Sequence, residues 1–199
     1  NKFIESGFPN RKQEDWKFLD ISQIIKKNIS DLSYFIDYSQ SNKIDPFTFV
    51  DGLEHNKIIF LNGRIEKIDF NHEDKSKIEI SDETKKDISF NYENSLIDLN
   101  SAFTDKVFKI LVKKDYSLKK PLIIYHSTND SIKSTNINLR LDFELGENSC
   151  LKLIDYFTNN TTKNFINIFY NFNLEKDSIL KNYKIDKFRN DNLTYSFNN

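Results

Sequence analysis

The chain has 199 residues and a formal net charge of −1 at pH 7, and 30% of its residues are charged. This balance excludes a broadly basic protein that attracts nucleic acid or an anionic membrane surface. No apolar run approaches the ~20 residues that a membrane-spanning helix requires. The single cysteine, Cys150, excludes an internal disulfide framework. We therefore expect a cytoplasmic protein that contacts neither nucleic acid nor membrane.

Short helices are predicted at the start of the chain. Asn10 belongs to the residue types that cap helices well, and it precedes a predicted helix over residues 11–18. Trp16 and Leu19 are expected to face inward from this segment. A second short helix is predicted over residues 21–27.

A β-hairpin is predicted next. The apolar run that ends at Leu61 leads into Asn62-Gly63, a strong turn signal, and a second strand returns through residues 64–70. The polar residues 71–90 are expected to form a loop with one short helix or strand. Residues 95–103 are predicted to form a helix directly before the main β region.

A strand-and-turn pattern recurs in the second half of the chain. Residues 136–149 read NINLRLDFELGENS, and residues 167–178 read NIFYNFNLEKDS; a shift of 29 positions superimposes Leu145 on Leu174 and Lys152 on Lys181. A fainter copy, residues 108–119, aligns with the first at a shift of 33. Repeats of this length are typical of architectures that stack one structural unit on the next.

Each copy alternates apolar and polar residues, which predicts a strand with one buried face. A single unit cannot bury its own apolar face, so the units are expected to stack. We therefore predict a mainly β fold, a β-solenoid and more specifically a parallel β-helix. The alternative is an antiparallel sandwich whose strands resemble one another by chance.

Residues 8–18 (FPNRKQEDWKF) resemble the N-terminal signature of the SufD family, in which a Pro, an Arg-Lys pair, a Glu and a Trp-Lys-aromatic cluster follow one another. Residues 59–64 (IFLNGR), 99–103 (LNSAF), 119–126 (KKPLIIYH) and 145–148 (LGEN) agree in order and spacing. The positions that carry this signature are expected to be structural: Arg11, Lys12, Glu14, Trp16, Lys17, Asn62, Gly63 and Gly146.

The resemblance implies an N-terminal helical region, here residues 1–105 with the hairpin near 57–70, followed by a right-handed parallel β-helix whose first coils occupy residues 106–199. It also implies that the chain is the N-terminal portion of a longer protein. The implied function is a non-catalytic scaffold of iron-sulfur cluster assembly.

The partners that the resemblance implies are a SufB-like paralogue and a SufC-like ATPase, bound mostly through regions beyond residue 199, with a cysteine desulfurase acting indirectly. No cofactor is expected to stay bound to this portion, because the iron-sulfur cluster is handled transiently by the full complex.

Two other functions remain open from the sequence. Parallel β-helices also occur in polysaccharide lyases and hydrolases, and Arg140, Asp142 and Glu144 are expected on a solvated outer face. In an enzyme of that class, a carboxylate pair on this face would supply the acid and the base. A purely structural repeat protein is the third possibility, although the aperiodic start of the chain argues against it.

No catalytic or metal site is predicted from the reactive side chains. Cys150 aligns with Ile179 of the next copy, so it is expected to be a small buried hydrophobic residue. His55, His72 and His126 lie in separate segments without a second histidine or cysteine at the spacing of metal ligands.

Overall fold

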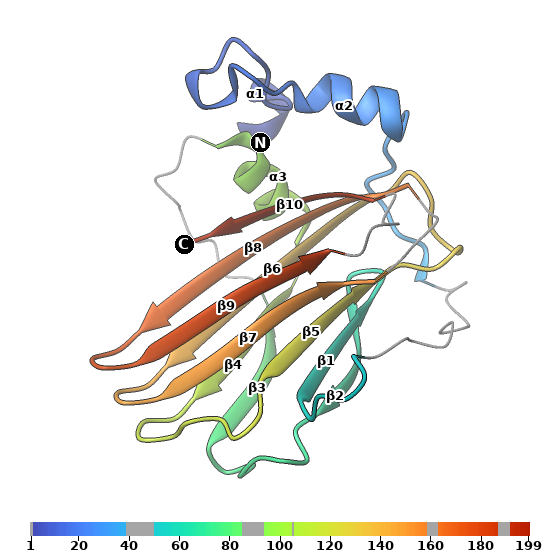
Figure 1. The fold of residues 1–199 in the computed structure, drawn as a ribbon. Coiled ribbons are helices and arrows are strands. Elements are labelled where there is room, and N and C mark those ends of the chain that lie inside the picture. The colour runs from blue at the N-terminus through green and yellow to red at the C-terminus, as the bar shows by residue number, and fades with distance from the viewer. Residues whose placement is uncertain (1, 39–49, 85–93, 105, 159–162, 187–191) are drawn as a thin grey trace.

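The computed structural model describes residues 2–38, 50–84, 94–104, 106–158, 163–186 and 192–199. Over these residues the protein is mainly β, as predicted, and its strands form two five-stranded mixed sheets. Figure 1 shows the two sheets as stacked layers, with a small group of helices at one side. A mainly β fold is therefore confirmed.

We call the two layers sheet I and sheet II. Sheet I has the strand order β2 (Arg64–Asp69), β1 (Asn56–Leu61), β5 (Leu122–Ser127), β7 (Cys150–Phe157) and β9 (Ile179–Asp186). Sheet II has the order β10 (Leu193–Asn198), β8 (Phe165–Leu174), β6 (Asn136–Leu145), β4 (Lys106–Val112) and β3 (Ile78–Thr84).

From β4 onward the chain alternates between the two sheets, and each strand runs parallel to its neighbours from the adjacent units. Within the described residues, antiparallel pairing joins β1 to β2 and β3 to β4. Because β1 also pairs with β5, both sheets combine strands from the two sides of residue 105, the expected boundary between the regions.

The sequence repeat coincides with the pairing of the strands. In sheet II, β6 and β8 pair residues that lie 29 positions apart, from Asn136 with Phe165 to Leu145 with Leu174. In sheet I, β7 and β9 use the same spacing, beginning with Cys150 opposite Ile179. The fainter copy also agrees, since β4 and β6 pair residues 33 positions apart. Equivalent side chains of successive copies therefore lie side by side.

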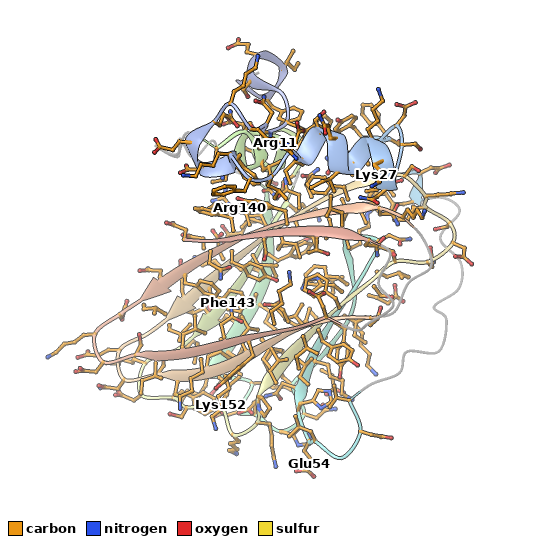
Figure 2. All side chains as sticks on the ribbon, turned by 45° about the horizontal axis from the view of Figure 1, so that its top comes forward. Arg11, Lys27, Glu54, Arg140, Phe143 and Lys152 are labelled. Atoms are coloured by element: carbon orange, nitrogen blue, oxygen red, sulfur yellow. The ribbon has the colours of Figure 1, made fainter. Side chains whose placement is uncertain are left out.

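The main core lies between the sheets. The apolar residues of β6 are all buried, and Phe143 and Leu145 are completely enclosed. Figure 2 shows Phe143 in the space between the layers. Burying one Leu, Ile or Phe side chain contributes about 1.5–3 kcal/mol. The inward rows of both sheets therefore supply most of the apolar stabilisation.

Three helices form a second, smaller core on the outer face of sheet II. They are α1 (Lys2–Ser6), α2 (Ile21–Asn28) and α3 (Ser95–Phe103), and the last two confirm the helices predicted over residues 21–27 and 95–103. Asp20 and Asn94 cap α2 and α3 by accepting backbone hydrogen bonds at 3.0 and 2.9 Å. Their buried side chains pack with Phe165 of β8.

The predicted helix over residues 11–18 is wrong. Asn10 does accept a hydrogen bond from the backbone of Lys12 at 3.0 Å, but the chain continues as tight turns with a single 3₁₀ helix, Glu14–Trp16. Trp16 is half-buried against the helical core, whereas Leu19 is 43% exposed and does not face inward. Packing of Trp16 thus outweighs the weak helix signal of this short segment.

The predicted hairpin is present as β1 and β2. Asn62 has φ of 51° and Gly63 has φ of 82°, the left-handed conformations that a tight two-residue turn needs. The strand expected within residues 71–90 is β3, and residues 85–90 lie outside the described residues. The hairpin does not stand alone, because β1 pairs with β5 and so joins sheet I.

Candidate functional site

The signature segment near the N-terminus presents charge on its surface. Arg11, Lys12, Glu14 and Lys17 are all exposed. Trp16 attaches the segment to sheet II, because its ring lies 5.9 Å from the ring of Tyr195 on β10. The structure therefore separates one anchoring aromatic residue from four solvent-facing charged residues.

Asn62 is held within the turn between β1 and β2 by side-chain hydrogen bonds. Its side-chain nitrogen donates to the side-chain oxygens of Asn129 at 2.9 Å and Ser131 at 3.2 Å, and its side-chain oxygen accepts from the backbone of Asn129 at 3.1 Å. Asn62 is only 2% exposed. These bonds join the hairpin turn to the connection between β5 and β6.

Gly63 and Gly146 both lie where another segment approaches closely. A Cβ atom at Gly63 would be 2.7 Å from Cγ2 of Ile137, and one at Gly146 would be 2.6 Å from the backbone nitrogen of Lys114. Gly146 forms the corner between β6 and β7, and its own backbone nitrogen donates to Val112 at 2.9 Å. At Gly146 the obstacle is backbone, so it cannot turn aside as a side chain would.

Cys150 is half-buried and free, at the start of β7 on the outer face of sheet I. The expectation that Cys150 is a small buried residue is therefore wrong. Its register partner Ile179 is 51% exposed, because the outer face of β9 is uncovered.

A buried polar cluster joins the two sheets: His126 of β5, Asp155 of β7 and Tyr170 of β8. Nε2 of His126 lies 3.0 Å from Oδ1 of Asp155, and the Tyr170 hydroxyl donates to the same oxygen at 2.5 Å. The three residues are 2–3% exposed. The imidazole also lies between two nearly parallel rings, Phe60 at 5.8 Å and Phe157 at 4.6 Å.

Two hydrogen bonds of this cluster meet at the carboxylate of Asp155. Both Nε2 of His126 and the Tyr170 hydroxyl can donate to the carboxylate of Asp155, which lowers the cost of burying that oxygen. Burial raises the pKa of Tyr170 well above its ordinary value, and the negative charge of Asp155 raises it further. Nδ1 of His126 is buried without a hydrogen-bond partner in the described structure.

The cluster therefore stabilises the contact between sheets and keeps its reactive groups away from solvent. In the sequence, His126 is one of three histidines in separate segments, and no motif links it to Asp155 or Tyr170. A signal was available, because all three occupy inward positions in strands whose other inward residues are apolar. The structure brings His126 together with these residues but leaves His55 and His72 elsewhere.

Glu73 is a second buried polar residue that the sequence did not reveal. Its carboxylate accepts hydrogen bonds from Asn56 at 2.8 Å, from Tyr116 at 2.7 Å, and from the backbone nitrogens of Lys119 and Lys120 at 3.1 and 3.0 Å. Burial alone would raise the pKa of Glu73, but these four donors lower it below the ordinary value. Glu73 thus joins three segments of the fold.

The predicted solvated row on β6 is wrong at its first residue, Arg140. Arg140 is 1% exposed, and its Nε lies 3.4 Å from Oδ1 of Asp142. Figure 2 places Arg140 on the side of the sheets that faces the helices. Burial raises the pKa of Asp142, and the charge of Arg140 opposes that change. Glu144 forms an ion pair with Lys109 at 2.7 Å, so both carboxylates contact a cation.

Among the described residues, no group of three or more His, Cys, Asp and Glu side chains is arranged to hold a metal ion. The helices of the described structure are all too short or too polar to cross a membrane. No protein-family model and no curated protein matches the chain.

Proposed function

We propose that this chain is part of a SufD-like scaffold protein of iron-sulfur cluster assembly, without catalytic activity of its own. In this proposal the two sheets are the opposing sides of a right-handed parallel β-helix. The N-terminal helices and the hairpin precede its first coils.

One observation carries the proposal: the 29-residue repeat of the sequence is also the spacing of parallel strand pairing in both sheets. From β4 to β10, successive strands belong alternately to sheet II and sheet I, as the strands in successive turns of a β-helix do. A helical layer packs beside these coils, in keeping with the order of regions that the resemblance to SufD implies.

The signature positions fit a scaffold role. Gly63 and Gly146 lie at close approaches between segments, and Asn62 is fully hydrogen-bonded within the fold. Residues that are buried in order to stabilise the fold do not have to contact a substrate. The exposed residues Arg11, Lys12 and Lys17 remain available to a partner protein.

The proposed partners are a SufB-like paralogue and a SufC-like ATPase in the cytoplasm, with sulfur supplied indirectly by a cysteine desulfurase. The iron-sulfur cluster is the cargo of the full complex, and no resident cofactor is assigned to this chain.

The proposal is tested by affinity purification of the protein that carries this chain, expressed with a tag in its own cells. We expect a SufB-like protein and an ABC-type ATPase to be enriched over a tag-only control, as measured by quantitative mass spectrometry. Depletion of the protein should also lower the activity of iron-sulfur enzymes. A folded bait that enriches neither protein refutes the assignment.

A further inference from the structure

The outer face of strands β7 and β9 carries an ordered pattern of side chains. Because Leu151, Leu153 and Leu180 point into the core between the sheets, the alternate residues of both strands face outward. The outward residues form pairs across the two strands: Cys150 with Ile179, Lys152 with Lys181, Ile154 with Tyr183, and Tyr156 with Ile185. We call these eight residues the β7–β9 outer face.

This face exposes large apolar side chains. Ile179, Tyr183 and Ile185 are 51%, 56% and 42% exposed. They continue an apolar cluster on the same side of sheet I, where Tyr125 and Tyr156 are buried and Val50 packs against them. The cluster is thus covered over β1 and β5 and uncovered over β9. Exposed apolar groups that extend a buried cluster are typical of a surface that binds another molecule.

Two lysines lie side by side in the middle of the face. Lys152 and Lys181 are register partners on neighbouring strands and are both exposed, and no acidic side chain of the described residues forms an ion pair with either. Like charges directly opposite each other disfavour strand pairing. The same two lysines are equivalent positions of the sequence repeat, so the pair is a consequence of the stacking itself.

The outer face of the other sheet is covered by a segment of the chain itself. The outer face of sheet II carries α3, whose Asn100 side chain donates to the backbone oxygens of Leu139 and Asn167, both at 2.9 Å, while Leu96 and Leu99 pack with Phe165. A short helix of the same chain thus covers part of the outer face of sheet II, where the outward residues of β6 are polar and Phe165 of β8 is apolar. The β7–β9 outer face instead exposes large apolar side chains and a pair of lysines.

From this geometry we infer that the β7–β9 outer face binds an acidic amphipathic segment of a partner protein. Its apolar residues pack on Ile179, Tyr183 and Ile185, and its carboxylates pair with Lys152 and Lys181. Figure 2 shows Lys152 well separated from Arg11 and Lys27, so this surface is distinct from the exposed charges of the N-terminal segment. The inference does not depend on the identity proposed above.

The experiment uses a photo-crosslinking amino acid at position 183 of the full protein in its own cells, followed by sequencing of the crosslinked peptide. The same amino acid at Ile68, which is 45% exposed on β2, is the positional control. The double variant Lys152→Glu/Lys181→Glu tests the charge requirement. Lys67→Glu/Lys75→Glu changes the net charge equally at exposed lysines elsewhere.

We expect position 183 to crosslink to a peptide rich in acidic residues, and Ile68 not to. A synthetic copy of that peptide should bind the purified protein about tenfold more weakly after reversal of Lys152 and Lys181, and equally well after reversal of the control lysines. Circular dichroism verifies that both double variants remain folded.

The following results would overturn the inference. The first is crosslinking from position 183 that does not exceed crosslinking from position 68. The second is capture of a peptide without acidic residues, or binding that is insensitive to reversal of the two lysines. The third is crosslinking to a second copy of the same chain, which would make the face a self-association surface.

Discussion

Replacement of Glu73 by glutamine should destabilise the protein far more than its position in a polar loop suggests. Each oxygen of the Glu73 carboxylate accepts two hydrogen bonds: Asn56 and Lys120 donate to Oε1, and Tyr116 and Lys119 donate to Oε2. Glutamine retains one oxygen and places an NH₂ group where the other was. Two donors then lose their acceptor, and at least one of them, a backbone nitrogen, faces another donor.

The magnitude follows from those two bonds. A hydrogen bond to a charged group contributes about 1.5–3 kcal/mol, so we expect Glu73→Gln to lower the free energy of unfolding by about 3 kcal/mol or slightly more. For a chain of this size, that corresponds to a fall in Tm of roughly 6–12 °C. Glu66→Gln is the matched control, because Glu66 is exposed on β2, and it should change stability by less than about 0.5 kcal/mol.

The effect should depend on pH in a defined direction. Hydrogen bonding lowers the pKa of Glu73 in the folded protein below its ordinary value of 4.5. The stabilisation is therefore fully present above that value and is lost as the pH falls through the lower pKa of the folded state. Glutamine does not titrate, so the difference between the two proteins should shrink in acid.

Urea unfolding, followed by circular dichroism between about pH 7 and about pH 3, measures this difference. If Glu73→Gln is as stable as Glu66→Gln at neutral pH, the four hydrogen bonds do not stabilise the fold as described. A stability difference between wild type and Glu73→Gln that stays constant through the acidic range would contradict the role of the ionised carboxylate.

Two further substitutions test the buried cluster between the sheets and the corner that Gly146 forms between β6 and β7. Tyr170→Phe removes the hydroxyl that donates to buried Asp155 and should lower the free energy of unfolding in urea by about 1–3 kcal/mol. The control Tyr183→Phe, at an exposed tyrosine, should leave this free energy almost unchanged. Equal losses in the two variants would contradict the role of the buried hydrogen bond. Gly146→Ala forces a methyl group against backbone and should cost about 1–3 kcal/mol. The control Gly52→Ala places its methyl group in open space, but Gly52 has a φ of 73°, so this change should lower the free energy of unfolding by about 1 kcal/mol. A smaller loss for Gly146→Ala than for Gly52→Ala would contradict the close contact at Gly146.

Local patterns predicted much of the secondary structure. The alternation in β6 and β8, the Asn62-Gly63 turn and the helix over Ser95–Phe103 all appear where the sequence places them. These features depend on residues a few positions apart, so a periodicity of two or 3.6 is enough to recognise them. The segment after Asn10 is the counterexample, because its short helical pattern is weaker than the packing of Trp16.

The candidate sites were less accessible to sequence reasoning. Asp155 and Tyr170 come from different sheets, and Tyr170 lies 44 positions from His126. Glu73 meets Tyr116 across 43 positions. Nothing in the local pattern of a polar loop indicates that one carboxylate is enclosed by four donors. The alternation with apolar residues predicts Arg140 in solvent, yet the outer face of sheet II is covered as well.

By itself, the sequence determined the strands, the turn between β1 and β2, and the 29-residue spacing at which copies pair. An apolar row on one face of a strand must be buried, and equal spacing places equivalent rows together. Only the tertiary structure decided which outer faces are covered, where β1 and β2 join a sheet, and which polar side chains meet inside. Those outcomes depend on contacts between residues far apart in the chain. A local periodicity contains no information about the free energy of such contacts.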